Sequence, residues 1–206
     1  MRRTLMLKWK DGISPEERLQ AKEGLAYLGY ACRVLAIDFG EDLRIGLPSN
    51  FDLVVMHDHA SSVTLAAFDE DPAHGRFRKF LGSVTRSDAT VRVLWEHDGP
   101  PSQKGMVRHT AIFRWRNGVS TAQKDEAWEL LNRQRKVMPW LRWFACHADV
   151  SGNPSHHDWV LEAHFDDVEG YLAYSSHPLH KKASELNQLL TQDAITARVQ
   201  HVIRMG

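Results

Sequence analysis

The sequence predicts an α+β fold of two ferredoxin-like β-α-β-β-α-β repeats with antiparallel sheets, and three observations support this prediction. The 206-residue chain matches itself at an offset of 106 residues. The first segment of each half alternates in the way a β-strand does, and each half continues as helix, two strands, helix and strand. A period near 100 residues is too long for a solenoid repeat, so each copy is expected to be a domain-sized unit.

The internal repeat runs along the whole chain without a gap. Identical residues that coincide at this offset include Trp9 with Trp115, Gly12 with Gly118, Ser14 with Ser120, Pro48 with Pro154, Asp52 with Asp158 and Arg92 with Arg198. The sequence between the two copies is polar and rich in proline and glycine, as a linker should be. We therefore expect a first repeat over residues 1–97, a linker over 98–106 and a second repeat over 107–206.

The first half of the repeat predicts a strand and then a helix. Leu5, Leu7 and Trp9 alternate with polar and longer side chains, which predicts a strand over residues 3–10. Ser14 is a good N-cap and is followed by proline at the first helical position. The helix is expected to end near Gly29.

The rest of the repeat predicts three strands and two helical pieces. The strands are expected over residues 31–38, 51–57 and 90–95, and the helical pieces over 61–68 and 73–84, on either side of Pro72. An antiparallel sheet in this order carries helices on one face only, so its other face needs a cover. In the second copy, residues 107, 109, 111 and 113 alternate with residues 108, 110 and 112. Both sets mix apolar with basic groups, so the sequence leaves open which set faces the helices.

Composition excludes several classes of partner. Hydrophobic residues make up 43% of the chain and charged residues 25%, and the formal net charge is zero. This balance is typical of a globular protein and gives no electrostatic reason to expect nucleic acid or an anionic membrane as a partner. Cys32 and Cys146 form no CxxC pair, so we expect two reduced thiols and a cytoplasmic location.

The stretch from Tyr174 to His180 holds a tyrosine and two histidines around Pro178, and a weaker copy runs from Phe68 to His74. Together with the strand at residues 108–116, the Tyr-x-x-His-Pro-x-His element resembles the stress-responsive A/B barrel (Dabb) family and is similar to olivetolic acid cyclase-type dimeric α+β barrel proteins. The resemblance covers nearly the whole chain, once per half, and is better in the second half. Members usually pair two one-repeat chains sheet against sheet. The resemblance therefore implies an intramolecular dimeric α+β barrel here, with a further homodimer left open.

The resemblance also implies site residues. His180 and Tyr174 match the catalytic pair of the cyclases, and His109 matches a further pocket histidine. Trp128 matches an aromatic wall position. Trp159 stands where the cyclase has another histidine, which argues against the olivetolic substrate. We assign Trp128, Trp159 and His177 to substrate binding.

The two copies differ at these positions. The first copy keeps His74, but Phe68 replaces the tyrosine, and a phenyl ring packs without being able to pass a proton. Arg3 stands at the position of His109. We therefore place the pocket in the second repeat and regard His74 and Phe68 as remnants. The alternative, in which each repeat binds a different ligand, stays open.

The expected function is binding of a small molecule, aromatic or polyketide-like, by a protein that acts as a cofactor-free cyclase or isomerase. In this scheme, His180 removes a proton and the Tyr174 hydroxyl stabilises the developing oxyanion. A non-enzymatic stress-responsive barrel is the main alternative, in which His180 only caps a helix and Tyr174 only fills the core. A cofactor-free barrel monooxygenase is a weaker alternative.

The chain has 12 histidines, a residue type that commonly ligates metal ions. His57 and His59 lie at i and i+2 on one side of a strand, and His156, His157 and His164 lie near the matching strand. No third and fourth ligand stands at a definite spacing, so no metal and no cofactor is expected.

Overall fold

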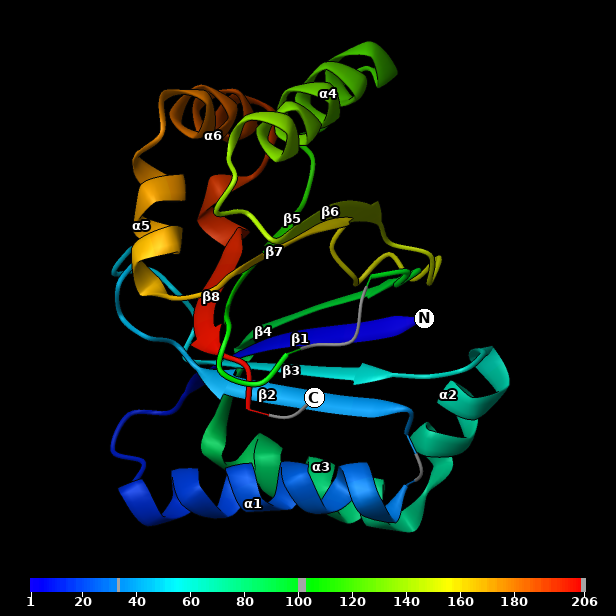
Figure 1. Cartoon of the computed structure of the whole chain (residues 1–206). Helices are drawn as coiled ribbons and strands as arrows, with labels where there is room; N and C mark the ends of the chain where they lie inside the picture. The colour runs from blue at the N-terminus through cyan, green and yellow to red at the C-terminus, as the bar shows by residue number, and fades with distance from the viewer. Residues whose placement is uncertain (33, 100–102, 205–206) are drawn as a thin grey trace.

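The structure, a computed structural model, describes residues 1–32, 34–99 and 103–204 (Figure 1). Three parts of the expected elements lie outside the described residues: linker residues 100–102, Arg33 and residues 205–206. The first repeat contains β1 (Arg2–Trp9), α1 (Pro15–Ala31), β2 (Ala36–Glu41), β3 (Leu53–Asp58), α2 (Ser62–Glu70), α3 (Pro72–Val84) and β4 (Thr85–Trp95).

The second repeat has the same order of elements. It contains β5 (Val107–Phe113), α4 (Thr121–Val137), β6 (Trp143–Ala148), β7 (Trp159–Phe165), α5 (Val168–Ser176), α6 (Pro178–Leu190), the 3₁₀ turn η1 (Asp193–Ile195) and β8 (Ala197–Val202). Each repeat forms one antiparallel sheet, ordered β2-β3-β1-β4 and β6-β7-β5-β8. The predicted β-α-β-β-α-β order and the α+β class are confirmed.

Local sequence explains the helix starts. Ser14 and Glu17 form a capping box at α1, and Ser120 and Gln123 form the equivalent box at α4. At the start of α6, however, the Nδ1 atom of His177 accepts a hydrogen bond from the backbone N–H of Leu179 (3.1 Å). The capping role considered for His180 therefore belongs to His177.

Some element boundaries differ from those expected. Helix α1 continues two residues past Gly29, and β2 begins at Ala36 rather than near residue 31. Strand β4 begins at Thr85, directly after α3, rather than at residue 90. The repeat also has a gap. Ala36 pairs with Asp58 in the first sheet, and Trp143 pairs with His164 in the second. The offset between β3 and β7 is therefore 106 residues, whereas that between β2 and β6 is 107.

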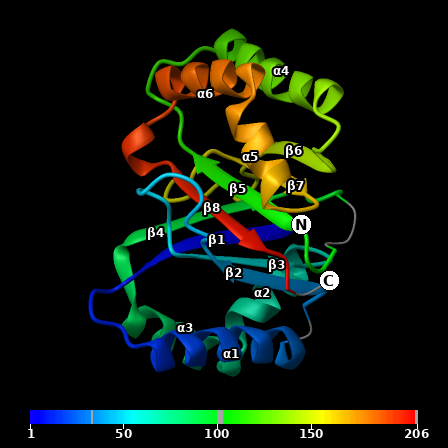
Figure 2. The ribbon, with the colours of Figure 1, turned by 60° about the vertical axis from the view of Figure 1, so that its left-hand side comes forward.

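The two sheets pack face to face, and each carries its helices on the outer side (Figures 1 and 2). The interior between the sheets contains a buried apolar cluster drawn from both repeats, which includes Met6, Val54, Trp95, Ile112, Val160 and Val199. Each sheet thus covers the face of the other that would otherwise remain exposed. In β5, Arg108, Thr110 and Ile112 face the other sheet, whereas His109, Ala111 and Phe113 face the helices.

Hydrogen bonds join the two sheets at both edges in a pseudo-twofold arrangement. The strand ladders are not continuous across these edges, because each sheet keeps its own four strands. The bridging bonds run from Leu43 N to Gln200 O (2.7 Å) and Phe51 N to Arg198 O (2.9 Å) at one edge, and from Val150 N to Leu94 O (2.8 Å) and His157 N to Arg92 O (3.0 Å) at the other. One chain therefore builds internally the paired-sheet arrangement expected of a dimer.

A charged cluster is buried at one end of this interior. Glu162 is fully buried and accepts hydrogen bonds from Arg2 Nη1 (2.8 Å), and its Oε1 atom lies 3.2 Å from Arg108 Nε. Arg108 Nη1 also donates to Asp38 Oδ2 (2.6 Å), and Arg2 Nε donates to Asp58 Oδ1 (2.7 Å). The pairs Arg2–Glu162 and Arg108–Asp38 connect the two repeats, so they help to fix how the sheets are placed on each other.

No helix in the described part of the chain has the length and apolar character needed to cross a membrane.

Candidate functional site

A cavity of about 300 Å³ lies in the second repeat, between the helix-facing side of its sheet and helices α5 and α6. Most of its lining comes from three elements. His109, Ala111 and Phe113 come from β5, Tyr171, Tyr174 and Ser175 from α5, and His180, Ser184, Asn187 and Gln188 from α6. Residues 45–47 of the first repeat close one side. Gly46 approaches so closely that an added Cβ would lie 2.3 Å from Gln200 Oε1.

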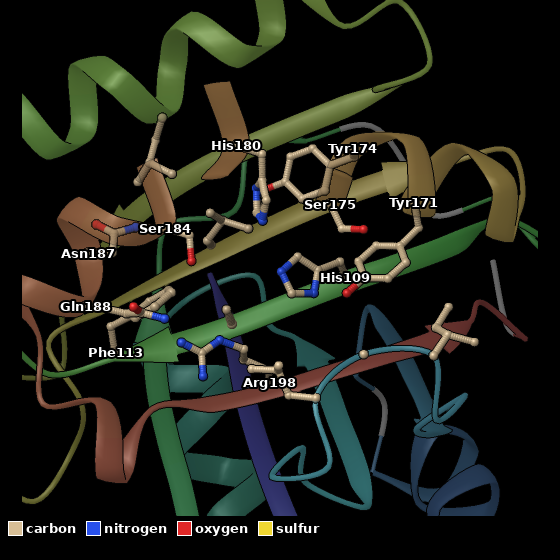
Figure 3. A pocket seen from close by; sticks show the side chains of 16 residues that line it. His109, Phe113, Tyr171, Tyr174, Ser175, His180, Ser184, Asn187, Gln188 and Arg198 are labelled. Atoms are coloured by element: carbon tan, nitrogen blue, oxygen red, sulfur yellow. The ribbon is translucent and has the colours of Figure 1, made fainter. Parts of the chain in front are cut away.

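Three of the expected site residues converge on this cavity. Figure 3 shows His180 reaching down from α6, Tyr174 from α5 and His109 up from β5. The ring centroids of Tyr174 and His180 are 4.2 Å apart, and those of Tyr174 and His109 are 6.1 Å apart. The Tyr174 hydroxyl and His180 Nδ1 are buried and have no hydrogen-bond partner among the described residues. A buried polar atom without a partner costs about 1–3 kcal/mol, so both atoms can gain from a hydrogen bond to a ligand that reaches them.

Both histidines of the cavity are held in the neutral form. Burial lowers the pKa of His109 to about 3, with smaller contributions from His180 and Arg198. Burial also lowers the pKa of His180 to about 4, aided by the positive charge of Arg198. Burial raises the pKa of Tyr174 well above its ordinary value, so its hydroxyl keeps its proton. At neutral pH the cavity therefore offers imidazole bases and a phenol donor.

Acid should destabilise the protein well before its carboxylates titrate. The unfolded state binds protons on these histidines near pH 6.5 and the folded state only near pH 3–4. Unfolding is therefore favoured as pH falls from about 6.5. Each such imidazole should contribute a slope of about 1.4 kcal/mol per pH unit in that window. Urea unfolding followed by tryptophan fluorescence from pH 7.5 to 5 measures this slope. A free energy of unfolding that stays constant over this range would contradict the prediction.

A chain of hydrogen bonds from the first repeat sets the tautomer of His109. Asn50 Nδ2 donates to Asp42 Oδ1 (3.0 Å) and to Gln200 Oε1 (2.7 Å). Gln200 Nε2 in turn donates to His109 Nδ1 (2.7 Å). Because Nδ1 accepts, the proton of neutral His109 resides on Nε2. The first repeat, expected to be a scaffold only, thus orients a side chain of the cavity.

The structure places the other expected binding residues away from this cavity. Trp159 is buried behind Phe113, with ring centroids 4.0 Å apart. Trp128 lines a separate surface cavity of about 540 Å³ beside Trp115. His177 caps α6, and its ring lies 6.1 Å from Trp140. The expected aromatic wall is therefore formed by Phe113 and Tyr171, which sequence reasoning did not select.

The matching region of the first repeat is filled. His74 stacks on buried Phe68 with ring centroids 4.2 Å apart, and Arg3 makes a two-bond contact with Asp69 (2.6 and 2.5 Å). The first repeat also has larger side chains where the second is small. At the 106-residue offset, Leu5 corresponds to Ala111, Phe77 to Ala183 and Arg78 to Ser184. Ala111 and Ser184 are thus smaller than their counterparts, and both line the cavity of the second repeat.

Several residues of the cavity were missed in the sequence, although a signal for them exists. Ser184, Asn187 and Gln188 follow His180 at helical spacing along one face of α6, where a helix that only packs on a core would carry apolar residues. Arg198 and Gln200 lie two apart on β8, on the same side as His109. A search for polar residues on the core-facing side of the last helix and strand would have found both sets.

In the described part of the chain, the histidines do not gather into a metal site. Among the described residues, no group of three or more His, Cys, Asp or Glu side chains could hold a metal ion. His57 Nδ1 and His59 Nε2 instead lie 2.8 Å apart in a hydrogen bond with each other. Burial lowers the pKa of His59 to about 4.

The family assignment comes from a comparison with known protein families. Residues 1–92 and 107–197 each match the family described as Stress responsive A/B Barrel Domain, Dabb. The chain belongs to the Dabb family. The expected tandem arrangement is confirmed, since the two matches cover the two repeats. A search of curated proteins finds no match to this Dabb chain.

Solved structures share the fold of this tandem Dabb protein. An anthrone oxidase-like protein matches 98% of the chain and 90% of its own, with a TM-score of 0.67 at 12% identity. A putative monooxygenase from Fusobacterium nucleatum subsp. nucleatum matches 99% of the chain and 92% of its own, with a TM-score of 0.63 at 10% identity. A dimeric ferredoxin-like protein of unknown function from Thermobifida fusca is 27% identical over 52% of this chain and 99% of its own, with a TM-score of 0.45. At 10% and 12% identity, the first two show a common architecture only.

Proposed function

We propose that this Dabb protein binds an aromatic or polyketide-like carbonyl compound in the second repeat and acts on it as a cofactor-independent cyclase or isomerase. The observation that carries the proposal is the pairing of Tyr174 and His180. Both side chains line one cavity of about 300 Å³, a size at the lower end of small-molecule sites, and each has a buried polar atom without a partner among the described residues.

The chemistry needs only groups that the cavity contains. A neutral His180 takes a proton from the carbon next to a ligand carbonyl, which leaves an imidazolium and an enolate. The Tyr174 hydroxyl donates a hydrogen bond to the enolate oxygen, where negative charge grows. In an isomerase, the imidazolium returns the proton at a different atom. In a cyclase, the enolate carbon bonds to a second carbonyl carbon of the same ligand, and the new alkoxide takes the proton back.

The environment supports this assignment of roles. The phenol stays protonated because burial raises its pKa, so it can donate. His180 is unprotonated at neutral pH, so it can accept. A pKa near 4 makes it a weak base in the empty cavity, and a ligand that brings negative charge would strengthen it. His109, with its proton fixed on Nε2 by Gln200, is a second donor from the strand side.

A direct test is exchange of carbon-bound hydrogen. The protein should accelerate incorporation of deuterium from D₂O into the benzylic CH₂ of phenylacetone, measured by proton NMR. Linear polyketide acids, with products followed by mass spectrometry, then separate cyclisation from isomerisation. Absence of exchange above the buffer rate for phenylacetone and for the polyketide acids would reject the enzymatic proposal and favour the non-enzymatic barrel.

Tyr174→Phe should separate catalysis from packing. The variant should lower the exchange rate by about 10²–10³-fold, because one donor to the oxyanion is lost. Its free energy of unfolding should be unchanged or higher, because the removed hydroxyl has no protein partner. Tyr27→Phe, on the exposed side of α1, is the control and should change neither quantity. A stability loss without a rate loss would point to a structural tyrosine.

A cofactor-free monooxygenase is the second candidate. Two solved structures of the same two-repeat architecture are named as an anthrone oxidase-like protein and a putative monooxygenase. The same base could deprotonate a phenol or anthrone-like ligand before reaction with oxygen. Oxygen consumption with a panel of quinols separates this candidate from the cyclase, which consumes none.

A further inference from the structure

The charge of the cavity wall indicates what kind of ligand fits it. Sixteen residues line the cavity, and they include no Asp, Glu or Lys (Figure 3). His109 and His180 are neutral at pH 7. Arg198, on β8, is therefore the one lining residue with a full charge. Figure 3 shows its guanidinium extending from the strand towards Gln188, below the two histidines.

Arg198 is only weakly neutralised by the protein. Among the described residues, its guanidinium hydrogen-bonds only Asp193, through Nη2 at 3.2 Å. The Asp193 side chain is 53% exposed and that of Arg198 17%, and a pair of this kind contributes little in water. The guanidinium carbon also lies 5.8 Å from the ring centroid of Phe113, another lining residue. Most of the five N–H donors of the guanidinium thus remain available to a ligand.

A second, outer cavity gives independent support. It has a volume of about 530 Å³ and shares Leu47, Gln188 and Arg198 with the inner cavity. Four basic side chains line it, against two acidic ones. The basic residues are Lys8, Arg86, Arg114 and Arg198, and the acidic residues are Asp88 and Asp193. Arg86 pairs with Asp88 and Arg198 with Asp193, so the net positive charge of this neighbouring cavity comes from Lys8 and Arg114 and attracts anions.

We propose that the ligand of the inner cavity is an organic carboxylate, an aromatic or polyketide-like acid, whose anion is bound by the Arg198 guanidinium while its carbonyl region lies at Tyr174 and His180. This inference rests on the proposed function for the location of the ligand and adds its chemical class. Guanidinium and carboxylate match as bidentate partners, which also fixes the orientation of the ligand. The carboxylate would offset the charge that weakens His180 as a base.

Binding of two unreactive probes tests this inference without any need for catalysis. Phenylacetate and phenylacetamide have nearly the same size and differ in charge, and isothermal titration calorimetry measures both. The unaltered protein should bind phenylacetate about 10- to 100-fold more tightly, the usual worth of a charge-assisted hydrogen bond. Arg198→Gln should abolish this preference and leave phenylacetamide binding nearly unchanged. Arg198→Lys should keep part of the preference.

The controls separate the possible outcomes. Arg142→Gln removes the same charge from an exposed pair with Asp166 and should leave the preference intact. Equal binding of the two probes, binding of neither, or a preference that survives in Arg198→Gln would overturn the inference. A lost preference in Arg198→Gln together with no deuterium exchange on phenylacetone or on the polyketide acids would uphold carboxylate binding and reject catalysis. Deuterium exchange without any preference for phenylacetate over phenylacetamide would support catalysis and reject carboxylate binding.

Discussion

Replacing His180 with glutamine should lower the rate of deuterium exchange by about 10²–10⁴-fold, the usual cost of removing a general base. Glutamine keeps much of the volume and polarity of imidazole but cannot accept a proton at neutral pH. Because His180 Nδ1 has no partner among the described residues, the substitution breaks no protein hydrogen bond at that atom. The folded structure should therefore survive, and circular dichroism should confirm this.

The repeat supplies a matched control for this variant. His74 occupies the same position in the first repeat, stacked on Phe68 rather than on a tyrosine. His74→Gln should leave the exchange rate within about twofold, since surface or packing changes away from chemistry have small effects. Equal losses in both variants would show that the two repeats share the activity, contrary to a single pocket. No loss in His180→Gln would remove the base from the proposal.

The pH dependence of the exchange rate tests whether His180 acts as a base, because a purely structural histidine would not set this dependence. A base with an ordinary histidine pKa near 6.5 would be about nine-tenths protonated at pH 5.5. Since the pKa of His180 is lowered to about 4, the rate should stay flat from pH 8 down to about pH 5.5. Fluorescence at each pH confirms that the protein is folded. A rate that halves near pH 6.5 would contradict the burial of this base.

Replacing Arg108 with methionine should destabilise the protein by about 3–5 kcal/mol, the typical cost of removing one partner from a buried ion pair. Arg108 is fully buried and contacts Asp38 (2.6 Å) and Glu162 (3.2 Å) from opposite sheets. Methionine retains much of the side-chain volume, so the loss is mainly electrostatic. The measurement is the urea midpoint at pH 7.5, where the acid effect on the histidines is absent.

Two further variants identify the cause of this loss. Arg142→Met removes an exposed arginine from its pair with Asp166, and should cost no more than about 1 kcal/mol. Adding Asp38→Asn to Arg108→Met should recover part of the stability, because it removes a carboxylate left without its cation. Failure of the second substitution to recover any stability would mean that packing, not charge, explains the effect.

The sequence allowed the element order of each repeat to be predicted because local rules set it. The alternation of Leu5, Leu7 and Trp9, the Ser14 cap and the interruption at Pro72 act within a few residues, and the structure confirms the elements they predict. Boundaries were less certain. Helix α1 passes Gly29 because the residues after it still bond to the preceding turn, as in the bond from Cys32 N to Leu28 O (2.9 Å).

The 106-residue offset also indicated which repeat differs. It aligned Tyr174 with Phe68 and His180 with His74, and those pairs do lie at equivalent places on α5 and α2, and on α6 and α3. The offset could not show whether a cavity lies beside these residues. Ala111 and Ser184, which are far apart in sequence, both line the cavity with small side chains.

By itself, then, the sequence determined the two-repeat α+β class, the Dabb resemblance, and the Tyr174 and His180 pair as the residues to examine. Only the tertiary structure decided that Trp128, Trp159 and His177 lie elsewhere, that Arg198 supplies the single charge of the cavity, and that Asn50 of the first repeat orients His109 through Gln200. The physical reason is the distance along the sequence over which each interaction acts. Strand alternation and helix caps are local, whereas a cavity, its charge and the pairing of buried ions depend on which distant side chains the packed sheets bring together.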